Sequence, residues 1–316
     1  MRRAAYITPG RDLPPAIDLV RLAEQLGYDS VWVTHGHGRD SFLVLAAYAA
    51  ATTRLRVGNG VLQILPRHPV ATAQAALTLA ELSGNRFTLG LGISHRPMME
   101  DMLGLAIADP LGTMREYVAV LRGALAGGAH VDGTHYRVHW SAAMVSPPPA
   151  PPIYLAALSR RMLELAGEIA DGVILWLSPP AYVREVALPA LERGRRRAGK
   201  TLEGFEIVCA VPLAVTGDPD PARAAFRAEL VRYAALPFYR AMLETSGFGA
   251  ALRQFDREGV VPASLAQALG GIGDGATGRA FMAEYRTAGV TLPAVRPITF
   301  PDAPWYRRTL EEAAEW

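Results

Sequence analysis

The feature that most constrains the fold of this sequence is a regular alternation of short apolar, β-branched runs with alanine- and leucine-rich segments. The first such segment, at 14–27, begins with Pro14 and Pro15, has apolar residues at helical spacing and ends at Gly27. The β-type runs are apolar throughout, which is typical of parallel strands covered on both faces. The alternation predicts eight strands, at 3–8, 29–34, 55–62, 86–92, 152–158, 171–178, 205–215 and 290–298.

Eight such units predict an α/β fold of the (β/α)8 TIM-barrel type, with insertion segments. A chain of 316 residues, 50% of them hydrophobic, is long enough to bury a barrel core. Three segments depart from the alternation of strands and helices and are expected to be insertions, at about 96–112, 128–150 and 234–276. The second would hold a small hairpin followed by a proline-rich linker. Insertions of this kind are typical of walls and lids over an active face.

The composition indicates which classes of partner the protein is expected to bind. The 32 basic and 30 acidic residues nearly cancel, so we expect no attraction to nucleic acid or to an anionic membrane. No apolar run approaches the roughly 18 residues of a membrane span. The single Cys209 excludes an internal disulfide, and the N-terminus lacks an apolar signal run. We therefore expect a cytoplasmic protein that acts on a small molecule.

The stretch RFTLGLGISH at 86–95 looks at first like a dinucleotide-binding turn. That fingerprint needs a third glycine and belongs at the first strand, whereas this stretch lies at the fourth. It is better explained as a barrel strand whose carboxyl end carries Gly90, Gly92, Ser94 and His95. Since the carboxyl ends of barrel strands form the catalytic face, small residues there let a flat ligand approach the backbone, and His95 would point at it.

Other motifs are absent from the sequence. It has no nucleophile elbow, Walker-type phosphate loop or zinc-protease motif, which disfavours hydrolase, kinase and metalloprotease functions. His130, His135 and His139 have hairpin spacing without a carboxylate or cysteine at ligand spacing, so we expect no metal site. His35 and His37 lie in a glycine-bounded loop at the end of the second strand. There His35 is expected to be functional, while His37 is as well explained as an exposed turn residue.

The sequence resembles the luciferase-like flavin and deazaflavin oxidoreductases. The resemblance is densest at 57–95 and 151–177, and it covers essentially the whole chain. The further runs SHRPMMEDMLGL, MREYVAVLRGAL and LPFYRAML are similar to the branch that uses the deazaflavin coenzyme F420 instead of flavin mononucleotide (FMN). The resemblance implies one barrel domain over 1–316. It also implies a homodimer, because members of the family usually pair.

The resemblance further implies a cofactor site across the carboxyl ends of strands three to six. A bulge in the third strand, often with a non-prolyl cis peptide, backs the ring system in deazaflavin members. Backbone amides and a helix N-terminus after the fifth strand hold other cofactor atoms, and a helix N-terminus followed by two arginines suits a phosphate. The expected cofactor-binding residues are Thr34, Asn59, Gly60, Val61, Gly92, Ser94, Ala156, Ala157, Leu158, Ser159, Arg160, Arg161 and Trp176. Trp176 is equally consistent with the core.

The chain departs from the family at two catalytic positions. Thr34 and His35 stand where many deazaflavin relatives have an Asp-His pair, and His95 stands where sugar-phosphate dehydrogenases have a glutamate. A histidine near neutral pKa can donate a proton to a substrate that receives hydride. We therefore expect reduced F420 to reduce a C=C or C=N bond of a small unsaturated metabolite, with His95 or His35 as the proton donor. The alternatives are an FMN-dependent luciferase-like monooxygenase and a non-catalytic cofactor-binding barrel.

Overall fold

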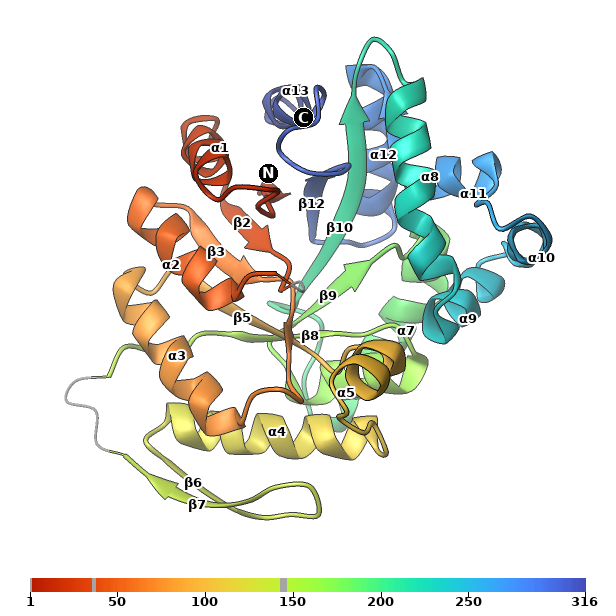
Figure 1. Ribbon diagram of the computed structural model, residues 1–316. Helices are drawn as coiled ribbons and strands as arrows, with labels where there is room; N and C mark the ends of the chain where they lie inside the picture. The colour runs from red at the N-terminus through yellow and green to blue at the C-terminus, as the bar shows by residue number, and fades with distance from the viewer. Residues whose placement is uncertain (1, 36–37, 143–146) are drawn as a thin grey trace.

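The computed structural model describes residues 2–35, 38–142 and 147–316. Eight parallel strands close into a barrel surrounded by helices, a (β/α)8 fold (Figure 1). The barrel is closed because β10 pairs with both β9 and β12, and β12 pairs with β1. The predicted fold class is confirmed. In spatial order the strands are β1 (Ala4–Tyr6), β2 (Ser30–Val33), β3 (Arg56–Asn59), β5 (Phe87–Gly92), β8 (Ile153–Ala156), β9 (Gly172–Trp176), β10 (Glu206–Val215) and β12 (Leu292–Pro297).

The eight predicted strand segments each contain one of these barrel strands. The third is interrupted, because a bulge at Gly60 and Val61 separates β3 from the short β4 (Leu62–Gln63), which pairs with β5. A further strand was missed: β11 (Gly271–Gly273) lies in a segment expected to contain only short helical pieces. It pairs with Leu213–Val215 of β10, beyond the point where β9 ends. Strand β11 has three residues, two of them glycine, so its own sequence does not predict a strand. It forms by pairing with the part of β10 that extends beyond β9.

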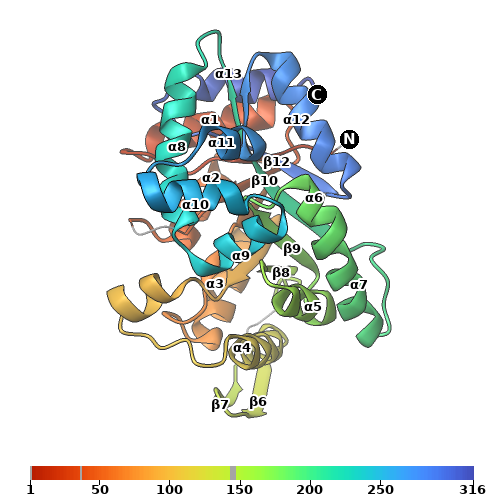
Figure 2. The same ribbon diagram turned by 90° about the vertical axis from the view of Figure 1, so that its right-hand side faces the viewer.

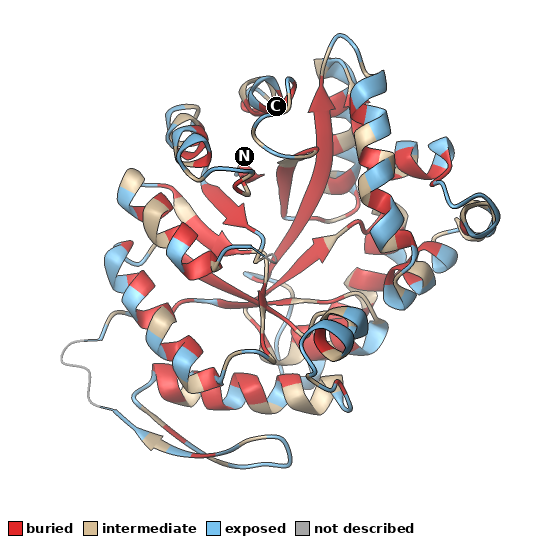
Figure 3. Ribbon diagram, in the orientation of Figure 1, coloured by how far each residue is buried: buried red, intermediate tan, exposed pale blue. Residues whose placement is uncertain are grey.

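The helices that alternate with the barrel strands cover the outside of the barrel and bury the face that packs on it (Figure 3). Several begin with a proline at the first turn, which matches the missing N–H groups there. No helix in the described ranges is long and apolar enough to span a bilayer. The helices are α1 (Pro14–Gln25), α2 (Ser41–Ala51), α3 (Pro69–Leu82), α4 (Pro110–Leu125), α5 (Arg160–Ile169), α6 (Pro180–Tyr182), α7 (Leu188–Arg197), α8 (Asp220–Ala234), α9 (Pro237–Thr245), α10 (Gly249–Glu258), α11 (Ala263–Leu269), α12 (Gly275–Thr287) and α13 (Tyr306–Ala313), with π-helical turns η1 (Pro97–Met102) and η2 (Val183–Ala187).

Three groups of elements stand apart from the βα rhythm. Turn η1 follows β5, and the antiparallel hairpin of β6 (Gly128–Asp132) and β7 (Arg137–Ser141) projects beyond α4 (Figure 1). Helices α9, α10 and α11 follow α8, and Figure 2 shows α9 beside α5. Residues 143–146 of the expected proline-rich linker lie outside the described residues.

The core has two layers, one between barrel and helices and one inside the barrel. Inside, Trp32 stacks between Tyr6 and Tyr154, with ring centroids 6.3 and 5.9 Å apart. Gly58 makes room for it, since a methyl group there would lie 2.6 Å from Trp32 Cε3. Ala4, Ala210 and Ala294 belong to the same buried inner cluster as these rings. The interior is thus filled by side chains up to the carboxyl rim.

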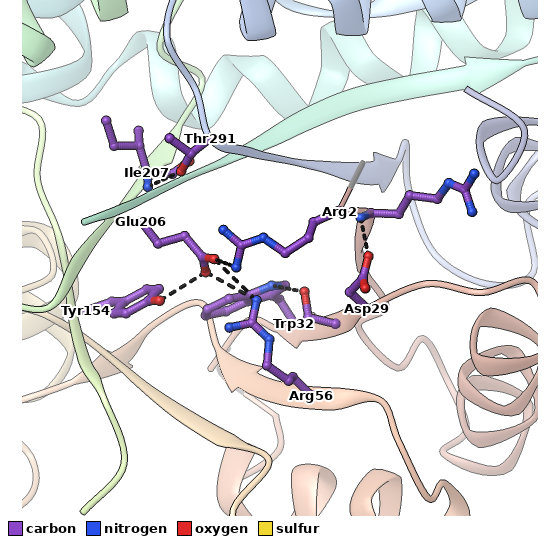
Figure 4. Close-up of polar contacts among 10 residues, drawn as sticks. Arg2, Asp29, Trp32, Arg56, Tyr154, Glu206, Ile207 and Thr291 are labelled. Atoms are coloured by element: carbon purple, nitrogen blue, oxygen red, sulfur yellow. Dashed lines mark hydrogen bonds and ion pairs between the residues drawn. The ribbon is translucent and has the colours of Figure 1, made fainter. Parts of the chain in front are cut away.

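A polar cluster closes the amino end of the barrel (Figure 4). Glu206, only 5% exposed, pairs with Arg2 and Arg56 and accepts a hydrogen bond of 3.0 Å from the Tyr154 hydroxyl. Polar residues at this end of a barrel contribute to stability, because chemistry occurs at the opposite rim.

Candidate active site

The strand bulge brings together three segments that were expected to bind a cofactor. The Gly60–Val61 peptide is cis. Because β3, β5 and β8 are neighbours, Val61 lies over the end of β5: a methyl group on Gly92 would be 2.6 Å from Val61 Cγ2 and 3.5 Å from Ala156 Cβ. Asn59, Val61, Gly92 and Ala156 therefore share one rim of the barrel.

The floor of this rim is apolar. Val61 and Trp176 are partly exposed and pack on the inner cluster of the barrel from its carboxyl end. Glycine at position 60 leaves room for the Tyr6 hydroxyl, since a β-carbon there would lie too close to its oxygen and something would have to shift. The backbone takes left-handed conformations at two strand ends, at Ser94 with φ 71° and at the buried Leu177 with φ 51°. Non-glycine residues rarely adopt this conformation, and they cluster at functional sites.

A chain of hydrogen bonds joins His35 to the bulge. Asn59 Nδ2 donates to Ser41 Oγ at 2.7 Å, and Ser41 Oγ lies 3.0 Å from His35 Nδ1. The Ser41 backbone N–H donates to the same Nδ1 at 3.2 Å. Burial lowers the pKa of His35, and Arg67 lowers it further while Asp40 opposes this. These surroundings together favour the neutral ring.

His95, at the end of β5, is partly buried beneath the insertion. Its ring lies 5.4 Å from that of Tyr239 on α9, between ring centroids. Burial lowers the pKa of His95, and the nearby Arg232 adds to this effect. Tyr239 is itself buried and touches Tyr233 of α8, with centroids 4.9 Å apart. Neither tyrosine was predicted to be part of the site.

Trp176 continues this aromatic wall. Tyr233 meets its ring edge-on at 5.8 Å, and the guanidinium of Arg296 lies over the ring at 5.0 Å. A two-pronged ion pair of 2.6 and 2.7 Å holds Arg296 to Glu229. Trp176 is thus part of the site wall as well as of the core.

The segment after β8 leads into helix α5. Ser159 caps the helix, since its side chain accepts a hydrogen bond from the Met162 N–H at 3.3 Å. Arg160 and Arg161 are exposed in the first turn, and the Tyr182 hydroxyl donates to the Leu158 carbonyl. A cavity of about 200 Å³ opens at this helix end, lined by Leu158, Ser159, Arg160, Tyr182, Val186, Phe238, Ala241, Met242 and Thr245. An anionic group would meet free N–H groups and a guanidinium there.

The remaining residues that were predicted to belong to the site make fewer contacts with the other site residues. Thr34 is exposed, and its N–H donates to Thr8 Oγ1 at 3.4 Å. No hydrogen bond within the described residues joins His35 to His95. His37 lies outside the described residues.

The other histidines have local roles. His68 caps α3 through its Nδ1, while His135 and His139 pair with Asp109 and Asp132. No three metal-ligating side chains gather in the parts of the chain that the structure covers.

The rim contains buried polar atoms that have no partner among the described residues. In the described structure, three buried side-chain atoms at the carboxyl end lack a hydrogen-bond partner: Asn59 Oδ1, His95 Nδ1 and Trp176 Nε1. Such atoms are costly unless a partner satisfies them. An apolar floor with a few convergent polar atoms is typical of cofactor sites.

A family model described as luciferase-like monooxygenase matches residues 1–292. The chain belongs to this family. Membership of the luciferase-like family makes the chain an oxidoreductase, as the sequence resemblance implied.

Among relatives within the luciferase-like family, an uncharacterized protein of Mycobacterium tuberculosis is 32% identical over 250 residues, covering 75% of this chain and 73% of that protein. A 5,10-methylenetetrahydromethanopterin reductase of Methanolobus tindarius is 35% identical over 213 residues, covering 67% of this chain and 64% of that protein. The solved structure of a coenzyme F420 dependent tetrahydromethanopterin reductase from Methanopyrus kandleri matches with a TM-score of 0.82, at 23% identity, over 99% of this chain and 97% of that one. At that identity the match supports the fold.

Proposed function

We propose that this protein is an F420-dependent reductase, which transfers hydride from the reduced deazaflavin to a C=C or C=N bond of a small unsaturated metabolite. The observation that carries the proposal is the placement of Val61 against Gly92 and Ala156 at the rim. It gives a flat ring a continuous backing across three adjacent strands. Relatives named as F420-dependent or methanopterin reductases favour the deazaflavin over FMN.

Each part of the site has a task in this proposal. Asn59, Gly60 and Val61 would back the ring, with Thr34, Gly92, Ser94, Ala156, Ala157 and Trp176 around it. Leu158, Ser159, Arg160 and Arg161 would hold the anionic tail, and the cavity that the first three of them line at the start of α5 supports this. Bound F420 would supply the hydride, and the protein supplies positioning and a proton.

The proton would come from His35 or His95. Burial favours the neutral form of both rings, in which each presents one ring N–H that can donate a hydrogen bond to a substrate atom gaining negative charge. Transfer of a proton would use the ring after it has taken up a second proton from solvent, because a neutral imidazole is a very weak acid. The wall of Trp176, Tyr233 and Tyr239 favours a largely apolar, planar substrate.

We also propose one barrel domain that acts as a cytoplasmic homodimer. The outer face of α2 carries no charged residue, and that of α3 carries only Glu81. Leu43 and Leu82 on these helices are 75% and 54% exposed. An uncharged surface on adjacent helices is suited to a second copy of the chain.

The test is a fluorescence titration of the purified protein with F420 and, separately, with FMN. We expect F420 to bind at least about tenfold more tightly. Anaerobic mixing with reduced F420 and a panel of unsaturated ketones, esters and imines should then restore oxidised F420. Preferential FMN binding with oxygen consumption would support a monooxygenase instead, and binding without turnover of any acceptor would indicate a non-catalytic barrel.

A further inference from the structure

Ser41 lies at the centre of the polar chain that joins the bulge to His35. It is the first residue of α2 and is 1% exposed, while Asn59 is fully buried. Helix α2 begins with several N–H groups that have no partner within the helix. Asp40 accepts those of Phe42 and Leu43, and His35 Nδ1 accepts that of Ser41. The histidine thus acts as a second cap, which fixes its place relative to the helix.

The direction of the hydrogen bonds determines where the ring proton lies. A backbone N–H can only donate, so the Nδ1 that it contacts must be an acceptor. The Asn59 amide nitrogen also can only donate, which leaves the Ser41 hydroxyl hydrogen free to point at the same Nδ1. The neutral ring therefore carries its hydrogen on Nε2. Protonation at Nδ1 would break both contacts.

The charged groups near His35 do not override this arrangement. Asp40 and Arg67 form an ion pair of 2.6 Å, and their effects on the pKa of His35 are opposite. Burial remains the largest influence and favours the neutral ring. The hydrogen bonds thus determine the tautomer, and the surroundings favour the neutral state in which it exists.

We propose that Ser41 is a positioning residue: it couples Asn59, behind the ring site, to His35 and holds His35 as the neutral Nε2–H tautomer. The proposal rests on the proposed function only where it treats His35 as a proton donor, since the tautomer is a property of the protein alone. A fixed Nε2–H directs the single ring proton away from α2. A histidine that exchanged tautomers would present the proton only part of the time.

The test is ¹⁵N NMR of protein labelled at histidine, without cofactor, in which two-bond couplings report the tautomer of each ring. A His35→Gln variant identifies the signals of His35. We expect the wild type to show the Nε2–H form at pH 7. An Nδ1–H form or a charged ring at that pH would overturn the proposal, even if F420 binding and turnover proved correct.

Ser41→Ala removes the hydroxyl and keeps the backbone N–H. We expect the pKa of His35 to rise by about half to one pH unit, with a measurable share of the Nδ1–H form. The matched control is Ser83→Ala, which removes an equally buried hydroxyl near the amino end of β5. It should leave the His35 signals unchanged. Equal behaviour of the two variants would contradict a specific role for Ser41.

A double-mutant cycle separates the coupling from a general loss of packing. If Asn59 acts through Ser41, Asn59→Ala alone should shift the His35 titration, and it should add no shift in the Ser41→Ala background. Additive shifts would show that Asn59 and Ser41 act on His35 independently. That result would refute the coupling.

Discussion

The ring of Tyr239 on α9 covers the ring of His95, with 5.4 Å between the centroids. A residue in the inserted helices therefore controls how far water reaches a histidine at the end of β5. Burial is the largest influence on the pKa of His95. Replacing Tyr239 by alanine should raise that pKa toward the ordinary histidine value of about 6.5, because water would solvate the charged ring. NMR titration of His95 measures the change, and Tyr239→Phe, which keeps the ring, should leave the titration as it is.

The stability of the protein should depend on pH because the partly buried surroundings of His35 and His95 favour the neutral rings. The pKa of each is lowered in the folded state. The unfolded chain thus binds protons at higher pH than the folded one, and stability present above about pH 6.5 is lost as the pH falls. Urea unfolding at pH 7, 6 and 5 should show this decline. The decline should be shallower in a His35→Gln, His95→Gln double variant, and an equal slope would contradict the assignment.

Gly92 should affect ligand binding more than folding. A methyl group there would lie 2.6 Å from Val61 Cγ2, the end of a partly exposed side chain that can be pushed outward. Gly92→Ala is therefore expected to fold and to bind F420 at least about tenfold more weakly. Gly217→Ala is the matched control, since no atom lies within 4 Å of the added methyl. Adding Val61→Ala to Gly92→Ala should recover part of the affinity, measured by the same fluorescence titration.

The sequence predicts those features of the structure that depend on local residue patterns, and it does not predict those that depend on contacts between distant parts of the chain. The barrel strands are continuous apolar runs, so their number and order follow from local pattern. The bulge at Gly60 was implied by family resemblance, and the structure places the cis peptide there. Ser41 and Tyr239 were missed because their roles depend on contacts with His35 and His95 on other elements. No repeating pattern in the sequence predicts the path of a loop or the position at which an inserted helix packs.

The Glu206 cluster at the amino end of the barrel should matter for stability alone. Glu206→Gln removes the charge that faces Arg2 and Arg56 and weakens the bond from Tyr154 (Figure 4). We expect a loss of about 1–3 kcal/mol in the free energy of unfolding, as for a buried charge-assisted hydrogen bond. F420 affinity should not change, because the cluster lies at the rim opposite to the site. Glu311→Gln, which breaks an exposed helical pair with Arg307, should have little effect on unfolding.

The two arginines at the start of α5 should act on the tail of the cofactor and not on its ring. Arg160 and Arg161 are exposed, and Arg160 lines the cavity at the helix end. Charge-assisted contacts to a phosphate correspond to about tenfold to a hundredfold in affinity, so an Arg160→Ala, Arg161→Ala double variant should bind F420 more weakly by that factor. The same variant should bind a deazaflavin that lacks the phosphate tail as well as the wild type does. Arg184→Ala, at another exposed arginine paired with Glu185, provides the control.

Added salt should weaken F420 binding in the wild type and much less in the double variant, because the charges that salt screens are no longer there. An equal loss of affinity for both ligands would instead mean that the arginines support the ring site through the fold of the β8–α5 segment.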